Sequence, residues 1–188
     1  MASRKSSSRR TPRKKAARRP ARRATRMDAI ALLKDDHQRV RSLFERFERT
    51  RGEAQKQKLA EQICSELTVH AKIEEEIFYP AAREAIGDED LMNEAEVEHD
   101  TAKELIARIE ATSPSDEKFD ALVTVLGEYV MHHVKEEERE MFKQARRAGM
   151  DLAALGEQLA ERKRVLTSGS TGERIVGRLA AAVGGRER

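Results

Sequence analysis

The sequence predicts an all-α protein built as an up-down-up-down bundle of four helices. Apolar residues recur at alternating intervals of three and four along four long segments, which is the periodicity of one face of an α-helix. Hydrophobic and charged residues each make up 38% of the chain, so the apolar faces are narrow stripes rather than the two-sided core of a sheet. The connections between the segments are short, and helices joined in this way pack antiparallel.

The first two helices are expected between clear start and stop signals. The first follows Thr25 and Asp28, whose T-x-x-D spacing is a capping signature, and stops at Gly52. The second starts directly after this glycine and is closed by Gly87. Pro80 lies within its last turns, and because proline lacks a backbone N–H we expect it to bend them.

The third and fourth helices are separated by a break at residues 112–114. Asp88 is expected to cap the third helix. Ser113 is expected to cap the fourth, with Pro114 at its first position, and Gly149 to end it. With these limits the bundle comprises residues 27–148.

The two ends of the chain differ from the bundle in composition. Residues 149–166 are expected to form a short accessory helix, and the Ser-, Gly- and Thr-rich start of residues 167–188 indicates a flexible tail. Residues 1–26 contain twelve Lys and Arg residues and no acidic residue, so we expect a disordered basic arm. The chain has 37 basic and 34 acidic residues, which leaves 25 basic against 34 acidic residues outside the arm.

The basic arm suits a polyanionic partner. Bases that neutralise phosphates release counterions, and the arm has no aromatic residue to stack on nucleobases, so nucleic-acid binding through residues 1–26 would be independent of sequence. A solvated tail that keeps the protein soluble is the alternative. No segment reaches the roughly 18 apolar residues of a membrane-spanning helix. We therefore expect a cytoplasmic, nucleoid-associated protein without a membrane partner.

Six polar residues fall where the apolar stripes require core residues. A buried carboxylate or imidazole without a partner destabilises a small domain strongly, so these positions need a common compensation. Two of the histidines are followed four residues later by a glutamate, which places both side chains on one helix face about 6 Å apart. The six residues are His37, His70, Glu74, His99, His133 and Glu137.

A metal site explains all six positions at once. A single histidine on an apolar face is more often a hydrogen-bonded core residue, but four of the five histidines lie on the inward stripes of four different helices. His132 is expected to face outward, with Glu136 as an alternative ligand pair, and the remaining glutamates near the H-x-x-x-E units are expected to form a solvated acidic face. Mixed imidazole and carboxylate ligands suit iron, and also manganese or zinc.

These motifs resemble the hemerythrin-like HHE cation-binding domain. The resemblance covers about residues 27–148 and rests on His37, on H-x-x-x-E within HAKIEEEIFYP, on E-H at 98–99, and on H-x-x-x-E within HHVKEEEREMF. It implies that the six residues hold two non-haem iron ions with an oxo or hydroxo bridge, and that a small diatomic ligand, oxygen or nitric oxide, binds there. A ferritin-like centre is the rival, but only Glu96-x-x-His99 fits its motif.

One departure from the family bears on function. Oxygen-carrying hemerythrins have an H-x-x-x-H pair on the third helix, whereas Ala95 and Lys103 occupy the positions four residues before and after His99. Glu96 or Glu98 could complete the ligand shell. The resemblance therefore favours sensing of oxygen, nitric oxide, redox state or iron over reversible oxygen carriage. The alternatives are a DNA-compacting protein with the bundle as scaffold and a metal-dependent peroxidase-like enzyme, although no nucleophile or general base indicates catalysis.

Overall fold

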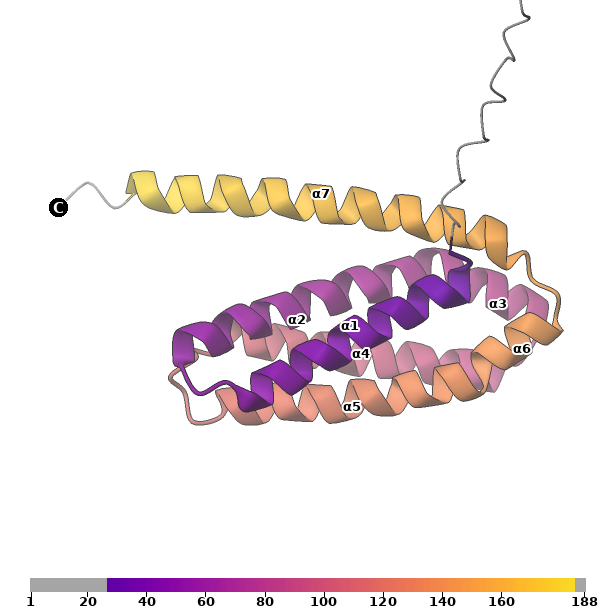
Figure 1. Ribbon diagram of the computed structural model, residues 1–188, viewed down its shortest axis with the longest axis horizontal. Helices are drawn as coiled ribbons and strands as arrows, with labels where there is room; N and C mark the ends of the chain where they lie inside the picture. The colour runs from indigo at the N-terminus through magenta and orange to yellow at the C-terminus, as the bar shows by residue number, and fades with distance from the viewer. Residues whose placement is uncertain (1–26, 185–188) are drawn as a thin grey trace, which may run out of the picture.

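The computed structural model describes residues 27–184, with side chains described for residues 27–168. Throughout this part of the chain the regular elements are helices, and four antiparallel helical units, here called helical arms, form the predicted bundle (Figure 1). The basic N-terminal segment, residues 1–26, lies outside the described residues. In chain order the elements are α1 (Ala29–Arg49), α2 (Glu53–Ile73), the π-helical η1 (Glu74–Phe78), α3 (Tyr79–Ile86), α4 (Glu89–Ala111), α5 (Phe119–Arg139), α6 (Met141–Arg147) and α7 (Leu152–Gly184).

Aspartates cap the first and third arms. The carboxylate of Asp28 accepts a hydrogen bond from the backbone N–H of Ala31 at 2.8 Å, so Asp28 is itself the N-cap of α1. Asp88 accepts in the same way from Leu91 at 3.2 Å at the start of α4. Thr25, the other half of the expected signature, lies outside the described residues.

The fourth arm starts later than expected. Ser113 and Pro114 do not open a helix, and α5 begins only at Phe119, whose ring is buried. The side chain of Asp116 accepts from the backbone N–H of Lys118 at 2.8 Å, which closes a local turn. Ser and Asp side chains offer the backbone such alternatives to a helix, and here the turns prevail until a core residue is reached. The arm is also interrupted near Glu140, after which α6 continues it.

The second arm contains a π-helical turn rather than a simple proline bend. The segment η1 lies between α2 and α3 and ends two residues before Pro80, which has no backbone N–H to donate. The wider turn buries the consecutive residues Phe78 and Tyr79 together with Glu74. Such turns are frequent at functional sites, and this one carries a predicted ligand.

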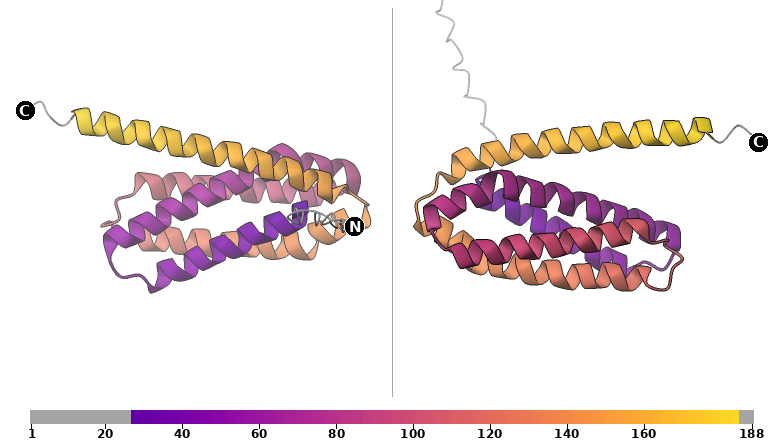
Figure 2. Two further views of the ribbon diagram at one scale, coloured as in Figure 1. Left: turned by 45° about the horizontal axis from the view of Figure 1, so that its top comes forward. Right: turned by 180° about the vertical axis from the view of Figure 1, so that it is seen from behind.

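The last helix is longer than expected. The sequence predicts an accessory helix ending at residue 166 and a flexible tail, whereas α7 extends to Gly184. The hydroxyls of Thr167 and Ser168 donate to backbone carbonyls three and four residues earlier, so these residues are accommodated within the helix. Figure 2 shows α7 passing over α1 and α2. Gly156 allows the contact, because an added Cβ would lie 2.5 Å from the carbonyl oxygen of Met27.

Two apolar clusters fill the two ends of the bundle. One includes Val40, Phe44 and Leu126, where the ring of Phe44 packs directly on Gly127. The other includes Phe142 and Leu159, the second of which comes from α7. The buried polar residues lie between these clusters, so the apolar ends seal the polar layer from both directions.

Candidate metal centre

The structure brings all six predicted residues into one buried layer. His37 comes from α1, His70 from α2, Glu74 from η1, His99 from α4, and His133 and Glu137 from α5; none is more than 7% exposed. Their donor atoms form two groups within which all atoms lie less than 4.8 Å apart. The first group is His37, His70, Glu74 and Glu137, and the second is Glu74, His99 and His133. Glu74 belongs to both groups.

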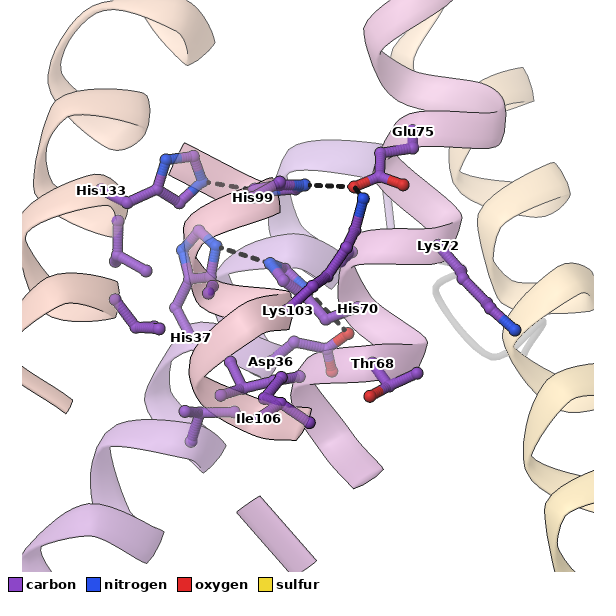
Figure 3. Close-up of a pocket in the computed structure, with 16 residues that line it drawn as sticks. Asp36, His37, Thr68, His70, Lys72, Glu75, His99, Lys103, Ile106 and His133 are labelled. Atoms are coloured by element: carbon purple, nitrogen blue, oxygen red, sulfur yellow. Dashed lines mark hydrogen bonds and ion pairs between the residues drawn. The ribbon is translucent and has the colours of Figure 1, made fainter. Parts of the chain in front are cut away.

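The imidazole nitrogens face one another in pairs. The Nε2 atoms of His37 and His70 lie 3.2 Å apart, and those of His99 and His133 also lie 3.2 Å apart (Figure 3). An oxygen of Glu74 lies 3.1 Å from Nε2 of His70 and 3.4 Å from Nε2 of His99. Donor atoms from five helical elements, α1, α2, η1, α4 and α5, therefore converge on the same small space.

Carboxylates behind the histidines fix which nitrogen points inward. Three histidines donate from Nδ1 to a glutamate, so Nε2 carries the lone pair. Such a carboxylate–histidine arrangement is common around protein-bound metals. The pairs are His37 with Glu138 at 3.0 Å, His99 with Glu75 at 2.9 Å, and His133 with Glu98 at 2.7 Å.

These supporting glutamates correct the sequence interpretation. Glu75 and Glu138 were expected on a solvated acidic face, and Glu98 was one of two residues that could complete the inner shell. In the structure each lies behind a histidine of another helix. The sequence does contain a feature that could have identified them: Glu75, Glu98 and Glu138 are each the direct chain neighbour of a predicted ligand. Glu96, the other expected shell residue, forms an ion pair with Arg83 at 2.6 Å on the surface.

His70 is backed by Asp36, which the sequence analysis missed. Its carboxylate is buried, and Oδ2 lies 3.6 Å from Nδ1 of His70. The other oxygen, Oδ1, forms an ion pair with Lys163 from α7. Asp36 directly precedes the predicted ligand His37, which places it in the same chain-neighbour pattern as the supporting glutamates.

The charges of the inner layer are balanced only in part by the protein: Nε2 of His37 lies 3.2 Å from Oε2 of Glu137, and although burial opposes it, this carboxylate raises the pKa of His37. Neither carboxylate oxygen of Glu74 or of Glu137 has a hydrogen-bond partner, although all four atoms are buried. Burial, and then the charge of Glu137, raises the pKa of Glu74 well above its usual range. Burial lowers the pKa of His70 to about 4, so its imidazole is neutral near pH 7. Divalent cations would satisfy these donors, and the donor set fits iron, manganese or zinc.

Tyr79 adds a phenol to the second group. Its hydroxyl oxygen lies 3.0 Å from Nε2 of His99 and 3.4 Å from Nε2 of His133. Burial, and then the nearby carboxylate of Glu74, raises the pKa of Tyr79 well above its usual value. Tyr79 carries no sequence signal of a site residue, because its place beside the site follows from the π-helical turn.

An apolar cavity opens on one side of the histidines, between α2 and α4. Its volume is about 280 Å³, and the four histidines form one of its walls (Figure 3). Lys103 lies at its edge and pairs with Glu75 at 2.8 Å, which connects α4 to η1. The apolar walls are formed by Val40, Leu67, Ala102, Ile106, Val130 and Val134.

The remaining histidine stays outside the layer. His132 is 63% exposed at its side chain and lies 3.2 Å from Glu136 on the outer face of α5. Ala95 is buried in the apolar cluster and Lys103 lies at the cavity edge, so α4 provides His99 without a second histidine four residues away.

Comparisons with known proteins agree with this geometry. The model of the hemerythrin HHE cation-binding domain matches residues 28–145. The chain belongs to this cation-binding family. An HHE domain-containing protein of Mycobacterium kansasii has the same fold, with a TM-score of 0.69 at 22% identity over 78% of this chain and 91% of that one. The HHE match ends before α7 begins.

A curated relative extends beyond the HHE domain. A protein of Nostoc sp. (strain PCC 7120 / SAG 25.82 / UTEX 2576) named DNA nickase is 35% identical over 116 residues, which cover 62% of this chain and 33% of the relative. The chain therefore spans about a third of the length of that relative. Among the described residues, no helix is long and apolar enough to cross a membrane.

Proposed function

We propose that this HHE protein holds two iron ions in a non-haem centre and that a small molecule, oxygen, nitric oxide or peroxide, binds there as a signal. The observation that carries the proposal is the convergence of buried donors within 4.8 Å of one another: the paired Nε2 atoms and the carboxylate oxygens of Glu74 and Glu137, which have no hydrogen-bond partner. Each bare lone pair in this layer costs free energy that a cation would recover.

The residues divide between two cations. His37, His70 and Glu137 would hold one ion, His99 and His133 the other, and Glu74 lies within reach of both. When bound, a pair of iron ions supplies one-electron redox chemistry and Lewis-acid positions for a small ligand. The supporting glutamates hold the protons on Nδ1 of His37, His99 and His133, so these three histidines keep Nε2 free for a cation.

The apolar cavity favours a small uncharged ligand. Val, Leu, Ile and Ala side chains form much of its wall, and Thr68, Lys72 and Lys103 are among its polar lining residues. A largely apolar wall desolvates an ion at a cost in free energy, and an uncharged molecule does not bear that cost. Because α4 provides no second histidine, the second ion would have fewer nitrogen donors than in the oxygen-carrying hemerythrins, whose third helix has an H-x-x-x-H pair. This difference supports a sensing role over reversible carriage, because a less saturated ion reacts further with its ligand.

Metal analysis of full-length protein from iron-replete cells tests the proposal. We expect about two iron ions per chain, as in other di-iron helical bundles. Anaerobic titration of the reduced protein with oxygen, nitric oxide or peroxide should change its visible spectrum in a saturable way. Protein that stays free of metal after iron loading, or a spectrum that none of these molecules changes, would contradict the proposal.

A second role, contact with nucleic acid, is supported by the basic arm and by the relative named DNA nickase. We propose that residues 1–26 tether the metal centre to DNA without sequence preference. Binding should weaken steeply with salt, with a slope near −0.9 per phosphate contact, and should be lost when residues 1–26 are deleted. His70→Ala should leave it unchanged.

Nicking is tested separately, on supercoiled plasmid with the iron-loaded protein. Nicking that requires both the arm and His70 would make the protein a nuclease. Binding without nicking would support a tether.

A further inference from the structure

His70 is supported differently from the other three histidines of the layer. Those three donate from Nδ1 to a glutamate at 2.7–3.0 Å. The Nδ1 atom of His70 instead faces Oδ2 of Asp36 at 3.6 Å, which is too long for a hydrogen bond. Both atoms are buried and neither has another hydrogen-bond partner. Asp36 is thus the carboxylate that faces Nδ1 of His70, and any support that it gives the ring depends on where the carboxylate is held.

Asp36 is the most buried of the four supporting carboxylates. Its side chain is 4% exposed, against 13% for Glu98, 24% for Glu138 and 29% for Glu75. A carboxylate so far from water needs a cationic partner, because an unpaired buried charge is strongly destabilising. Lys163 is that partner, through Oδ1.

Lys163 reaches Asp36 from a firmly packed part of α7. One turn before it, Leu159 is fully buried in an apolar cluster. Earlier in the helix, Gly156 lies against the backbone at the start of α1. The first half of α7 is thus fixed on the bundle, although it lies outside the residues that match the HHE family.

We propose that Lys163 is a positioning residue of the metal centre. By holding Asp36, it keeps the acceptor of His70 in place and so keeps Nε2 of His70 directed at the first cation. This inference rests on the proposed function, because it concerns the retention of an ion by His70. It makes α7 a part of the centre rather than an appendage: the helix determines how long one of the two ions stays bound.

The chain provides a matched control on the same helix. Arg162 donates to the carboxylate of Glu76 at 2.5 and 2.9 Å, and Glu76 lies outside both donor groups. Removing the Arg162 side chain weakens the docking of α7 to the same bundle. It leaves Asp36 and Lys163 in place, so it separates loosened docking from a displaced acceptor.

The experiment measures release of iron to an excess of chelator from the loaded full-length protein, followed by visible absorbance. In Lys163→Met, one of the two ions should leave about tenfold faster or more, as is typical when the partner behind a metal-binding histidine is lost. The other ion should leave at the wild-type rate. Lys163→Arg should restore slow release, and Arg162→Met should behave as wild type.

The double variant Asp36→Asn with Lys163→Met tests whether the lysine acts through the aspartate. If it does, iron should leave the double variant no faster than it leaves Asp36→Asn alone, so the effects of the two substitutions on the release rate are not additive. Additive effects, equal acceleration in Arg162→Met, or unchanged release in Lys163→Met would overturn the inference while the proposed function stands. A wild-type chain that binds no iron would overturn both. If Lys163→Met fails to fold, Asp36→Asn and Lys163→Arg decide in the same assay.

Discussion

The two halves of the polar layer are unlike in the donors that surround them. The first group has four, two imidazoles and two carboxylates, whereas the second has two imidazoles and a share of Glu74, with the phenol of Tyr79 nearby. Tyr79 also lines a further cavity together with Arg83 and Lys103. One fold thus places a group of four donors beside a group of three. If both groups bind a cation as proposed, we expect the first group to retain its ion more firmly and the second to leave more room for a ligand.

Removal of the shared carboxylate should have the largest effect, because it damages both halves. We expect Glu74→Gln to keep at most about one iron ion per chain and to bind it more weakly, against the two ions proposed for the wild type, because the first group keeps three donors and the second only two. The neutral amide has nearly the same shape, so loss of charge rather than of packing is tested. Glu76→Gln, two residues away on the same π-helical turn, should keep wild-type metal content. Equal iron in Glu74→Gln and the wild type would show that Glu74 is not shared.

Single histidine variants should separate the halves. His133→Ala leaves the second group with His99 and Glu74, too few donors to keep an ion, so about one iron ion per chain should remain. His37→Ala leaves the first group with three donors, so it should weaken binding without emptying that position. Iron analysis after chelator competition measures both. Equal loss of iron from the two variants would contradict the difference between the two donor groups.

The pH dependence of the metal-free protein should report Glu74. Because its pKa is raised by burial and by Glu137, the folded chain binds the proton of Glu74 more tightly than the unfolded chain does. At low pH Glu74 is protonated in both the folded and the unfolded chain, so it does not affect the unfolding free energy. As the pH rises above the ordinary carboxyl range, the unfolded chain releases this proton first, and the unfolding free energy falls. Denaturant unfolding at several pH values measures this slope. Glu74→Gln should flatten it, and an unchanged slope would contradict the assignment.

The smallest effect is expected from the phenol. Tyr79→Phe removes a hydroxyl next to His99 and His133 but no donor of the two groups, so iron content should not change. Unfolding free energy should change by about 1 kcal/mol, the usual contribution of one hydrogen bond. The visible spectrum of the loaded protein should shift, because the surroundings of the second ion change. Loss of an ion would instead make Tyr79 a necessary ligand.

The sequence alone determined the helical architecture and the composition of the inner layer. Apolar spacing identifies the four arms, and the same spacing shows that His37, His70, His99 and His133 occupy core positions. A helix has one periodicity, so a polar residue in register with leucines must point inward wherever the helix packs.

Only the tertiary structure decided what stands behind that layer. Glu75, Glu138 and Asp36 are one residue out of register with the ligands, which on an isolated helix reads as solvent-facing. Whether such a side chain meets water or a histidine of the next helix depends on how the helices are rotated against each other. The π-helical turn that buries Tyr79 and the docking of Lys163 from α7 depend on the same packing. Local periodicity determines which face a residue occupies, and contacts between distant segments determine what that face meets.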